Sequence, residues 1–572
     1  GSVSAAEDAA WAPLRSHAPT RSGQIVLSDG LPAASREALE TQRRLASENL
    51  DLQGRSLARL RSWAREDCLH AAGAYTSQIT GEQIEPADAS APLFAGGHQP
   101  ALFHTGVWIK NFVLGDLAAR VGGTGLNLVV DNDTLSTRGV KAPSGTREQP
   151  GIEWLPFDAP CAAQPWEDAT IADRTVFRSF ADRAVETMSQ WGIHPIVREM
   201  WPQAVRRSSE SDSLSDCLTA ARQFQERSFG LQNLELPLST MCRQPAFLWF
   251  ASHLLAHLPR FREIHNDVLW QYRKVNRIRS RSHPVPELAE QGGWLEAPFW
   301  MWRRGQEHRR QVFARQNGKQ LQLSDGDSVF ANLRLTPEMD ACCAVEGLQR
   351  LSADGIRFRT RALTTTLFAR LCLSDLFVHG IGGAKYDEMT DQIIQRFFGV
   401  ETPKFLMATA TLHLPLGMPH PVTESHARQL RHKLRDARFN PERYPLSEDI
   451  AQLVSRKREL IAHQKSASKS RLSVRQRRQR RAENRRRYLE FLQVNSQVAA
   501  HGREYRTRLA AELCDVEDQL AANKVLQDRE YSYALHPEES LRSQIASLAT
   551  EHEQPAPAPS ALDSVSTPPL PP

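Results

Sequence analysis

The sequence predicts an α/β protein whose core is a parallel β-sheet, with helical and β-hairpin insertions and a C-terminal antiparallel hairpin of long helices. Three observations lead to this fold class. Residues 93–131 have the pattern strand, loop, helix, strand, and α/β character returns over residues 338–400. Residues 421–530 instead have the pattern of long helices. Because a strand–helix–strand unit joins neighbouring parallel strands, the first two observations indicate one parallel sheet.

The first α/β region consists of short apolar runs around a helix, and a helical stretch over residues 32–80 precedes it. A strand is expected at residues 92–95 and a helix from about 107 to 120, ended by a glycine-rich turn. Residues 126–130 follow as a second strand. Short apolar strands bounded by turn signals are typical of a buried parallel sheet.

The insertions and the C-terminal region have different periodicities. Residues 165–282 are mostly helical, and residues 294–333 alternate like β-hairpins with turns at 316–319 and 324–327. Near the C-terminus, apolar residues recur with a period close to 3.5, which predicts an antiparallel coiled-coil hairpin with its tip near residues 466–470. These residues are Tyr505, Leu509, Leu513, Val516 and Leu520.

The patterns divide the chain into seven segments. The last of them is rich in Pro, Ala and Ser, a composition typical of disorder. The segments are a disordered N-terminus (1–25), the first half of the α/β core (26–160), a helical and β-hairpin insertion (161–335), the second half of the core (336–420), the helical hairpin (421–530), a segment that packs on the core (531–552) and a disordered tail (553–572).

Composition excludes some classes of protein. The chain has 572 residues and no run of about 18 apolar residues, so no transmembrane helix is expected. The N-terminus has no apolar segment of a signal peptide. The eight cysteines form no CxxC pair, which favours reduced thiols over a zinc site or a disulfide framework. A cytoplasmic location is expected.

The first candidate site is the loop Gly96-Gly97-His98-Gln99 and the residues that follow it. It lies after a strand and before a helix, where open α/β sheets bind ligands. His104 and Lys110 add a titratable group and a cation near the helix N-terminus, which favours anions. The alternative is a helix cap with surface histidines. The next strand ends in Asp131-Asn132-Asp133, suited to a hydroxyl, an amine or Mg²⁺, or to an Asx turn.

The second candidate site begins at His379. Three glycines, Gly380, Gly382 and Gly383, lie within four residues and indicate backbone packed against a ligand or another chain segment. An acid/base set surrounds this backbone: His379, Lys385, Tyr386 and Asp387, with a helix expected from about residue 387. A purely structural turn is the alternative.

At these two loops the sequence resembles the cysteine-adding enzymes of bacillithiol biosynthesis. That family has a GQQxGLF motif after its first strand, and here Gly97, Gln99, Leu102 and Phe103 match it while His98 and Ala101 differ. The family's EDHD-like cluster is similar to residues 131–133. Its RPLxQD…GPGExxY stretch is similar to residues 361–363, beginning with Arg361, and to Gly380, Gly382 and Tyr386, with Gly383 in place of an acid.

The resemblance implies a Rossmann-like core related to class I aminoacyl-tRNA synthetases and a coiled-coil hairpin that forms a homodimer. It implies a ligase that joins cysteine to the amine of glucosaminyl-malate. No cofactor is identified by the sequence; an adenine nucleotide, ADP or ATP, is the candidate. Under this interpretation His98, His104, Asp131, Asp133, His379 and Lys385 are catalytic. The ligand-binding set is Gly97, Gln99, Phe103, Lys110, Asn132, Arg361, Gly380, Gly382, Gly383, Tyr386 and Asp387, and no metal ligand is assigned.

The rival hypothesis is a coiled-coil interaction protein whose α/β core is inactive and whose basic helix binds nucleic acid. The net charge is +5, but residues 456–487 carry fourteen Lys or Arg and two Glu, so the remainder of the chain has a charge of −7. A helix with arginine on most of its faces needs a polyanionic partner or stays in water. No recognised nucleic-acid-binding motif accompanies it.

Three further segments carry side chains that could form a site. His253 and His257, four residues apart, suit a metal less well than helix packing, because no Glu follows His253. The basic stretch 273–284 is either a cover for an anionic substrate or a solvated helix end. Residues 296–302 are interpreted as a packed strand in preference to an aromatic binding platform.

Overall fold

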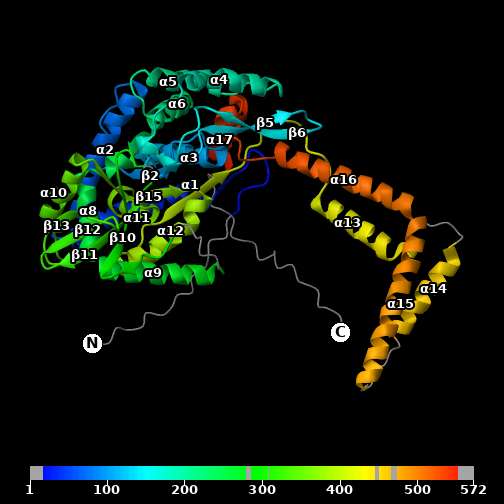
Figure 1. Ribbon diagram of the computed structural model, residues 1–572. Helices are drawn as coiled ribbons and strands as arrows, with labels where there is room; N and C mark the ends of the chain where they lie inside the picture. Colours follow the sequence, from blue (N-terminus) through cyan, green and yellow to red (C-terminus); the bar gives the residue numbers. More distant parts are fainter. Residues whose placement is uncertain (1–16, 279–284, 307, 445–449, 466–472, 552–572) are drawn as a thin grey trace. The chain divides into compact units, whose positions relative to one another are not determined.

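The computed structural model describes residues 17–278, 285–306, 308–444, 450–465 and 473–551, and the fold is given for these residues. The chain divides into two compact units (Figure 1). Unit 1 comprises residues 1–142, 153–414 and 529–572, and unit 2 comprises residues 143–152 and 415–528. In the part of the chain that is described, no helix has both the length and the apolar composition needed to cross a membrane.

Unit 1 is built on a six-stranded sheet in which all neighbours are parallel except the edge strand β1. The strand β2 is central: β3 and β8 follow it on one side, and β15 and β16 lie on the other. The strand order therefore reverses between β2 and β15. In spatial order the strands are β1 (Ile25–Leu27), β16 (Phe405–Ala410), β15 (Leu376–His379), β2 (Leu93–His98), β3 (Thr124–Val129) and β8 (Leu234–Pro237).

Helices follow the central strands and cover the sheet. α3 (Thr105–Val121) follows β2 and packs on β3 and β16, and α12 (Ile381–Ile393) follows β15. The expected helix over residues 32–80 is two helices, α1 (Leu31–Leu45) and α2 (Leu57–Thr80). α12 begins six residues before the expected position, because the glycine run forms its first turn.

A buried ion cluster fastens α2 to the sheet. Asp375, at the start of β15, contacts Arg61 and Arg65 of α2, the latter at 3.1 Å, and accepts the backbone N–H of Leu93 at 2.7 Å. All three charged side chains are at most 5% exposed. Each oxygen of the carboxylate is thus opposed by a cation, and one of them also accepts an N–H, which makes the burial tolerable.

The insertion forms a helical layer and a second, antiparallel sheet. The sheet order is β13 (Val329–Arg334), β12 (Gln320–Ser324), β11 (Arg310–Asn317), β10 (Trp294–Arg303) and β14 (Ile356–Thr360), with β9 (Glu290–Gln291) beside β10. Both expected hairpins are confirmed: β11 pairs with β12 and β12 with β13, and their turns contain Gly318 (φ +58°) and Gly326 (φ +97°).

Helices and two small ribbons make up the rest of this region. The helices of this region are α4 (Arg174–Ser189), α5 (Val197–Arg207), α6 (Leu214–Ser228), α7 (Leu238–Met241), α8 (Pro245–Ala256), α9 (Leu258–Val275), α10 (Cys342–Ala353) and α11 (Ala362–Phe368). Two small ribbons complete it: β4 (Thr134–Leu135) with β7 (Gln164–Pro165), and β5 (Gly139–Gly145) with β6 (Pro150–Pro156).

Unit 2 consists mainly of two helix pairs, α13 (Glu424–Phe439) with α16 (Arg503–Leu526) and α14 (Ala451–Lys465) with α15 (Val474–His501). The first pair is antiparallel, because Arg431 contacts Glu517 whereas Tyr444 stacks on Tyr505. Four of the five residues in the expected 3.5-residue repeat pack in this pair: Tyr505, Leu509, Leu513 and Val516. The expected hairpin tip at 466–470 lies outside the described residues, and supercoiling of the helices stays a prediction.

The ends of the described chain are tied to unit 1. The expected disorder of residues 1–25 is wrong for residues 17–25: Gly23 N–H donates to Thr411 O at 2.8 Å, and β1 begins at Ile25. At the other end, Tyr531, Tyr533 and Leu535 are buried, and α17 (Glu538–Glu551) follows. Residues 1–16 and the tail 553–572 are outside the described part.

Candidate functional site

The two glycine-rich segments meet at the carboxyl edge of the parallel sheet. β2 ends at His98 and β15 at His379, and the two strands are hydrogen-bonded neighbours. They are also the strands between which the order reverses. In open α/β sheets, ligands bind in the crevice that such a reversal leaves at the carboxyl ends.

Lys110 lies between the two segments. Its Nζ donates to the carbonyl oxygen of Gly97 at 3.0 Å, and its Cδ would lie 3.9 Å from a Cβ placed on Gly380. Lys110 is 5% exposed, and burial lowers its pKa to about 8. An ammonium group that has lost its hydration without gaining a carboxylate is easily deprotonated, so Lys110 can act as a base near neutral pH.

His98 is half-buried beside Lys110. Its Nδ1 lies 3.2 Å from Gln99 O, and its ring packs edge-on against Phe103, with the ring centroids 4.7 Å apart. Burial and, after it, the charge of Lys110 lower the pKa of His98 to about 3. His98 is therefore a neutral imidazole at physiological pH, fit to donate or accept a hydrogen bond but not to hold an anion by charge.

His104 caps a helix, which is the alternative to ligand binding that the sequence indicated for this segment. It is the N-cap of α3, and its Nδ1 accepts the backbone N–H of Gly106 at 3.1 Å. Its Nε2 lies 3.6 Å from Glu530. Side chains at this position satisfy helix N–H groups that otherwise lack partners. The cap turns His104 toward the C-terminal segment of unit 1.

The acidic cluster after β3 separates into different environments. Asp131 is buried and contacts Ser239, whose N–H it accepts at 2.8 Å. Burial and the nearby Glu167 raise its pKa to about 7. Asp133 instead contacts Gln99 and forms an ion pair with Arg309 at 3.0 Å.

A pocket opens where these residues meet the second sheet, and it is called the edge pocket here. Its volume is about 220 Å³. Asn132, Asp133 and Arg361, all expected from the sequence as site residues, line it. The remaining lining residues are Val130, Phe261, His265, Val285, Pro286, Leu288, Pro298, Trp300, Arg309, Thr360, Ala362, Leu363, Thr364 and Thr365.

Two arginines flank Trp300 in the edge pocket. The guanidinium carbons of Arg309 and Arg361 lie 4.9 and 4.4 Å from the centroid of its ring. Arg361 also contacts Glu296 at 2.5 Å. For both arginines burial lowers the pKa, against the opposing effect of the paired carboxylate. Each arginine already pairs with one carboxylate, Asp133 or Glu296, and its guanidinium group has further N–H donors that an anionic ligand could accept.

The second segment forms a closed ion cluster. His379 Nε2 lies 2.7 Å from Asp387 Oδ2, and Arg370 contacts the same carboxylate oxygen at 2.7 Å. Burial alone would raise the pKa of Asp387, but Arg370 and His379 lower it below its ordinary value. With His379 7% exposed, this cluster joins β15 to α12 rather than facing a pocket.

The glycines of this segment differ in what surrounds them. A Cβ on Gly383 would lie 2.7 Å from His379 Nδ1, so glycine is required there. A Cβ on Gly382 would meet nothing within 4 Å. Lys385 is exposed, and Tyr386 packs near Tyr272 of α9 with ring centroids 6.2 Å apart. Neither Lys385 nor Tyr386 lines the edge pocket.

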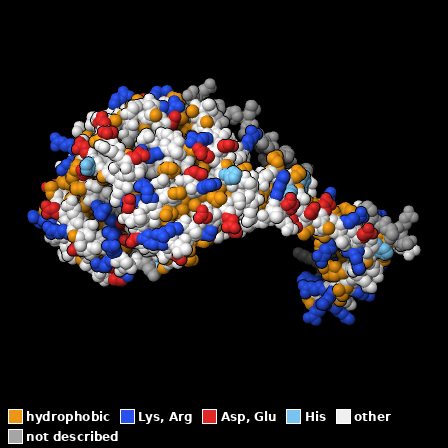
Figure 2. Space-filling view, turned by 90° about the horizontal axis from the view of Figure 1, so that it is seen from above, with side chains coloured by type: hydrophobic (Ala, Val, Ile, Leu, Met, Phe, Trp, Pro, Cys, Tyr) orange, Lys and Arg blue, Asp and Glu red, His pale blue; other side chains and the backbone are white. Residues whose placement is uncertain are grey.

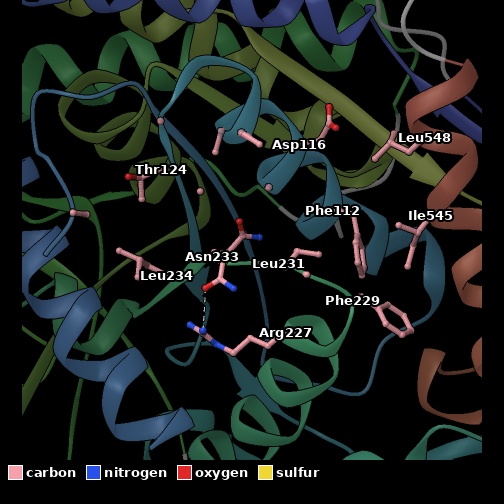
Figure 3. Close-up of a pocket in the computed structure, with 18 of the residues that line it drawn as sticks. Phe112, Asp116, Thr124, Arg227, Phe229, Leu231, Asn233, Leu234, Ile545 and Leu548 are labelled. Carbon is pink, nitrogen blue, oxygen red and sulfur yellow. Dashed lines mark hydrogen bonds between the residues drawn. The ribbon is translucent and has the colours of Figure 1, made fainter. Parts of the chain in front are cut away.

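A larger cavity lies at the opposite, amino edge of the sheet (Figure 3). Its volume is about 600 Å³, and Thr124 and Leu234, at the starts of β3 and β8, help to line it together with Phe112, Phe229 and Leu548. No residue expected from the sequence as a site residue lines this cavity. The edge pocket is preferred as the functional site because it lies beside the carboxyl end of β3 and is lined by two arginines. Gly97, His98, Lys110 and Gly380 do not line it.

Sequence reasoning missed Arg309, Trp300, His265 and the threonines of the edge pocket. Trp300 was interpreted as part of a packed strand, which it is, yet its ring also lines the pocket. His253 and His257 both contact Gln53, at 3.2 and 3.0 Å, as expected for packing. Within the described ranges, no three His, Cys, Asp or Glu side chains are grouped as ligands for a metal ion.

Comparison with models of protein families found no match, and a search of curated proteins found no similar sequence. The resemblance at the two glycine-rich segments therefore stays a prediction. The roles assigned to the residues depend on their contacts, burial and charge.

Proposed function

We propose that unit 1 is a ligase-type enzyme that holds an amino acid in the edge pocket and joins its carboxyl group to an amine. The observation that carries the proposal is the pair Arg309 and Arg361, which both line a small pocket, lie against the ring of Trp300 and have side chains only 19% and 11% exposed. A guanidinium group recognises a carboxylate by two parallel hydrogen bonds. The carboxylate of the ligand would lie between them.

The size of the pocket supports a small ligand. Its 220 Å³ is below the range of about 300–1,000 Å³ that is usual for drug-sized ligands. A single amino acid such as cysteine suits this volume. The hydroxyl group of Thr365 donates within the protein, to Thr360 at 2.7 Å, and this bond holds the two hydroxyl groups in place in the pocket lining.

Lys110 supplies the base in this proposal. An amine attacks a carboxyl carbon only after it has lost a proton, and Lys110, with a pKa of about 8, can accept that proton near neutral pH. The acceptor amine, expected to belong to a sugar conjugate such as glucosaminyl-malate, would have to approach Lys110, which fills the space between Gly97 and Gly380 and does not itself line the edge pocket. Positioning and electrostatic stabilisation would supply most of the rate enhancement.

An adenine nucleotide, ATP, is the co-substrate proposed to activate the carboxyl group: transfer of a phosphoryl or adenylyl group to the carboxylate would release ADP or pyrophosphate, and attack by the amine would then release phosphate or AMP. The N–H groups of Ile381, Gly382 and Gly383 open α12 without a side-chain cap, and a Cβ on Gly382 would meet nothing within 4 Å. Helix N-termini of this kind favour phosphate. A cytoplasmic location and a homodimer formed by the helices of unit 2 complete the proposal, as the resemblance implies.

Ligand-induced stabilisation tests the proposal. The midpoint of thermal unfolding of the full chain is measured with cysteine, other amino acids, glucosaminyl-malate, ADP and ATP, for the wild type and for R309Q/R361Q. The matched control is R334Q/R350Q, which removes two exposed arginines of unit 1. A ligand that binds the edge pocket should raise the midpoint of the wild type and the control only.

A product assay completes the test. The chain is incubated with cysteine, glucosaminyl-malate and ATP, and the condensed product is sought by mass spectrometry, with K110M as the inactive comparison. No stabilisation by any of these compounds, or equal stabilisation of R309Q/R361Q, would overturn the assignment of the edge pocket.

A further inference from the structure

The N-terminal half of α15 carries a group of exposed arginines that the proposed enzyme does not use. Figure 2 shows Lys and Arg side chains gathered at one end of unit 2, with hydrophobic side chains among them. The arginines that are exposed and belong to this helix are Arg475, Arg477, Arg478, Arg481, Arg485 and Arg486.

Acidic side chains do little to balance these arginines. Glu483 is the one acid between residues 474 and 487, and it pairs with Arg487 at 3.6 Å. Glu490, farther along, pairs with Arg456 of α14 at 2.6 Å. Both carboxylates therefore pair with arginines other than Arg478, Arg481 and Arg485. The electrostatic potential over this part of the helix is strongly positive.

Three of the arginines continue into an exposed apolar stripe along the same side of the helix. At 3.6 residues per turn, Arg478, Arg481, Arg485, Tyr488 and Leu492 fall within about 80° around the axis, and they extend over about 21 Å. Tyr488 is 59% exposed and Leu492 43%. This set of five residues is called the α15 stripe.

We infer that the α15 stripe binds single-stranded nucleic acid without reading its sequence. The three guanidinium groups would contact successive phosphates, and the ring of Tyr488 would stack on an adjacent base. Proteins that bind single strands combine a basic track with aromatic rings in this way, because every base presents a π-face. The inference concerns unit 2 and is independent of the edge pocket.

A membrane surface is the weaker match to this arrangement. Helices that lie in a membrane interface carry their charges and their apolar side chains on opposite faces. Here the arginines and the apolar residues follow one another on the same face. An acidic protein partner would satisfy the arginines but gives the exposed ring of Tyr488 no defined role.

Fluorescence anisotropy with the full chain and a labelled 20-nucleotide poly(U) RNA tests the inference. The variant R478Q/R481Q/R485Q should bind at least about tenfold more weakly. The matched control R428Q/K433Q/R435Q removes three exposed cations from α13 of the same unit and should bind within about twofold of the wild type. Circular dichroism checks that each variant keeps its helix content.

The salt dependence and the aromatic contact give two further readouts. Three phosphate contacts on a single strand predict a slope of log K against log salt of about −2, which the triple variant should lose. Y488A should weaken binding several-fold while Y488F does not, and R478K/R481K/R485K should retain most of the affinity because it keeps the charge.

Several outcomes would overturn the inference. If the α13 control loses as much affinity for poly(U) as the triple variant, net charge alone explains the binding. If duplex DNA or vesicles of anionic phospholipid bind as tightly as poly(U), and Y488A binds as tightly as the wild type, the ligand of the α15 stripe is a polyanion other than a single strand. Undiminished binding by the triple variant would remove the α15 stripe altogether.

Discussion

Lys110 and Gly97 are joined by a hydrogen bond of 3.0 Å that fixes a buried ammonium group at the point where the strand order of the sheet reverses. The bond uses one of the three protons of the ammonium group, and burial is the cause of its lowered pKa. Few arrangements place a lysine so deep without a carboxylate unless the amine has a chemical task.

The stability of unit 1 should rise with pH because of Lys110. Its pKa is about 8 in the folded protein and near 10.4 when unfolded, so between these values the unfolded chain binds more protons. K110M should therefore be more stable than the wild type at pH 7, by about 1–3 kcal/mol, and the difference should shrink by pH 10. Every tryptophan in the described part of the chain belongs to unit 1, so urea unfolding followed by tryptophan fluorescence measures the stability of this unit. A constant difference at both pH values would contradict the prediction.

Asp131 should have the opposite pH dependence. Its pKa is raised to about 7, far above that of an unfolded aspartate, so the folded protein binds more protons between about pH 4 and 7. This contribution to stability is complete below pH 4 and is lost as the pH rises to 7. D131N mimics the protonated carboxyl group beside Ser239. It should therefore reduce the change in the free energy of unfolding between pH 4 and pH 7 by about 1–3 kcal/mol. The check is unfolding by urea at pH 5 and pH 8; parallel curves for both proteins would refute it.

Removal of Asp375 should destabilise unit 1 severely. D375A would leave Arg61 and Arg65 buried without their carboxylate, which typically costs about 3–5 kcal/mol. The control is D116A, which breaks the more exposed pair of Asp116 with Arg120 on α3 and should cost under about 1 kcal/mol. The free energies of unfolding from tryptophan fluorescence compare them. Similar losses for both variants would show that the buried cluster does not fasten α2 to the sheet.

Two adjacent glycines of α12 should respond in opposite directions to the same substitution. G382A places a methyl group in open space within a helix and should stabilise by about 0.5–1 kcal/mol. G383A would press the methyl group against the ring of His379, which Asp387 holds in place, and should cost about 1–3 kcal/mol. The thermal midpoints measure both effects, and adding H379A to G383A should restore much of the loss if the contact is its cause.

The sequence was sufficient to predict which residues lie at the carboxyl edge of the parallel sheet. It was not sufficient to predict which residues of the antiparallel sheet line the edge pocket. Gly97 lies in the last residues of β2 and Asn132 follows β3, and the ends of neighbouring parallel strands share one edge, so their proximity could be predicted. Arg309 and Trp300 come from the antiparallel sheet, and periodicity carries no information on which outside strand packs against that edge. Arg361 was found by resemblance alone.

His104 shows why a residue type in the right place can mislead. A polar side chain just before a helix either caps it or faces a ligand, and the sequence pattern is the same in both cases. The backbone geometry decides, because Nδ1 of His104 lies within hydrogen-bonding distance of the Gly106 N–H. The glycine run at 380–383 was likewise expected to be a loop, although an uncapped helix start also accommodates it.

Tyr533 stacks on Trp108 with ring centroids 4.5 Å apart, and its N–H donates to Phe103 O at 2.9 Å. Tyr533 thus completes the packing around Trp108 and Phe103, and it is synthesised after all of unit 2. A nascent chain stopped at residue 528 would possess every strand of the parallel sheet and still expose Trp108. Trp108 therefore gains its stacking partner only when the last segment of unit 1 has been made, and until then this part of the chain presents apolar surface that chaperones can bind.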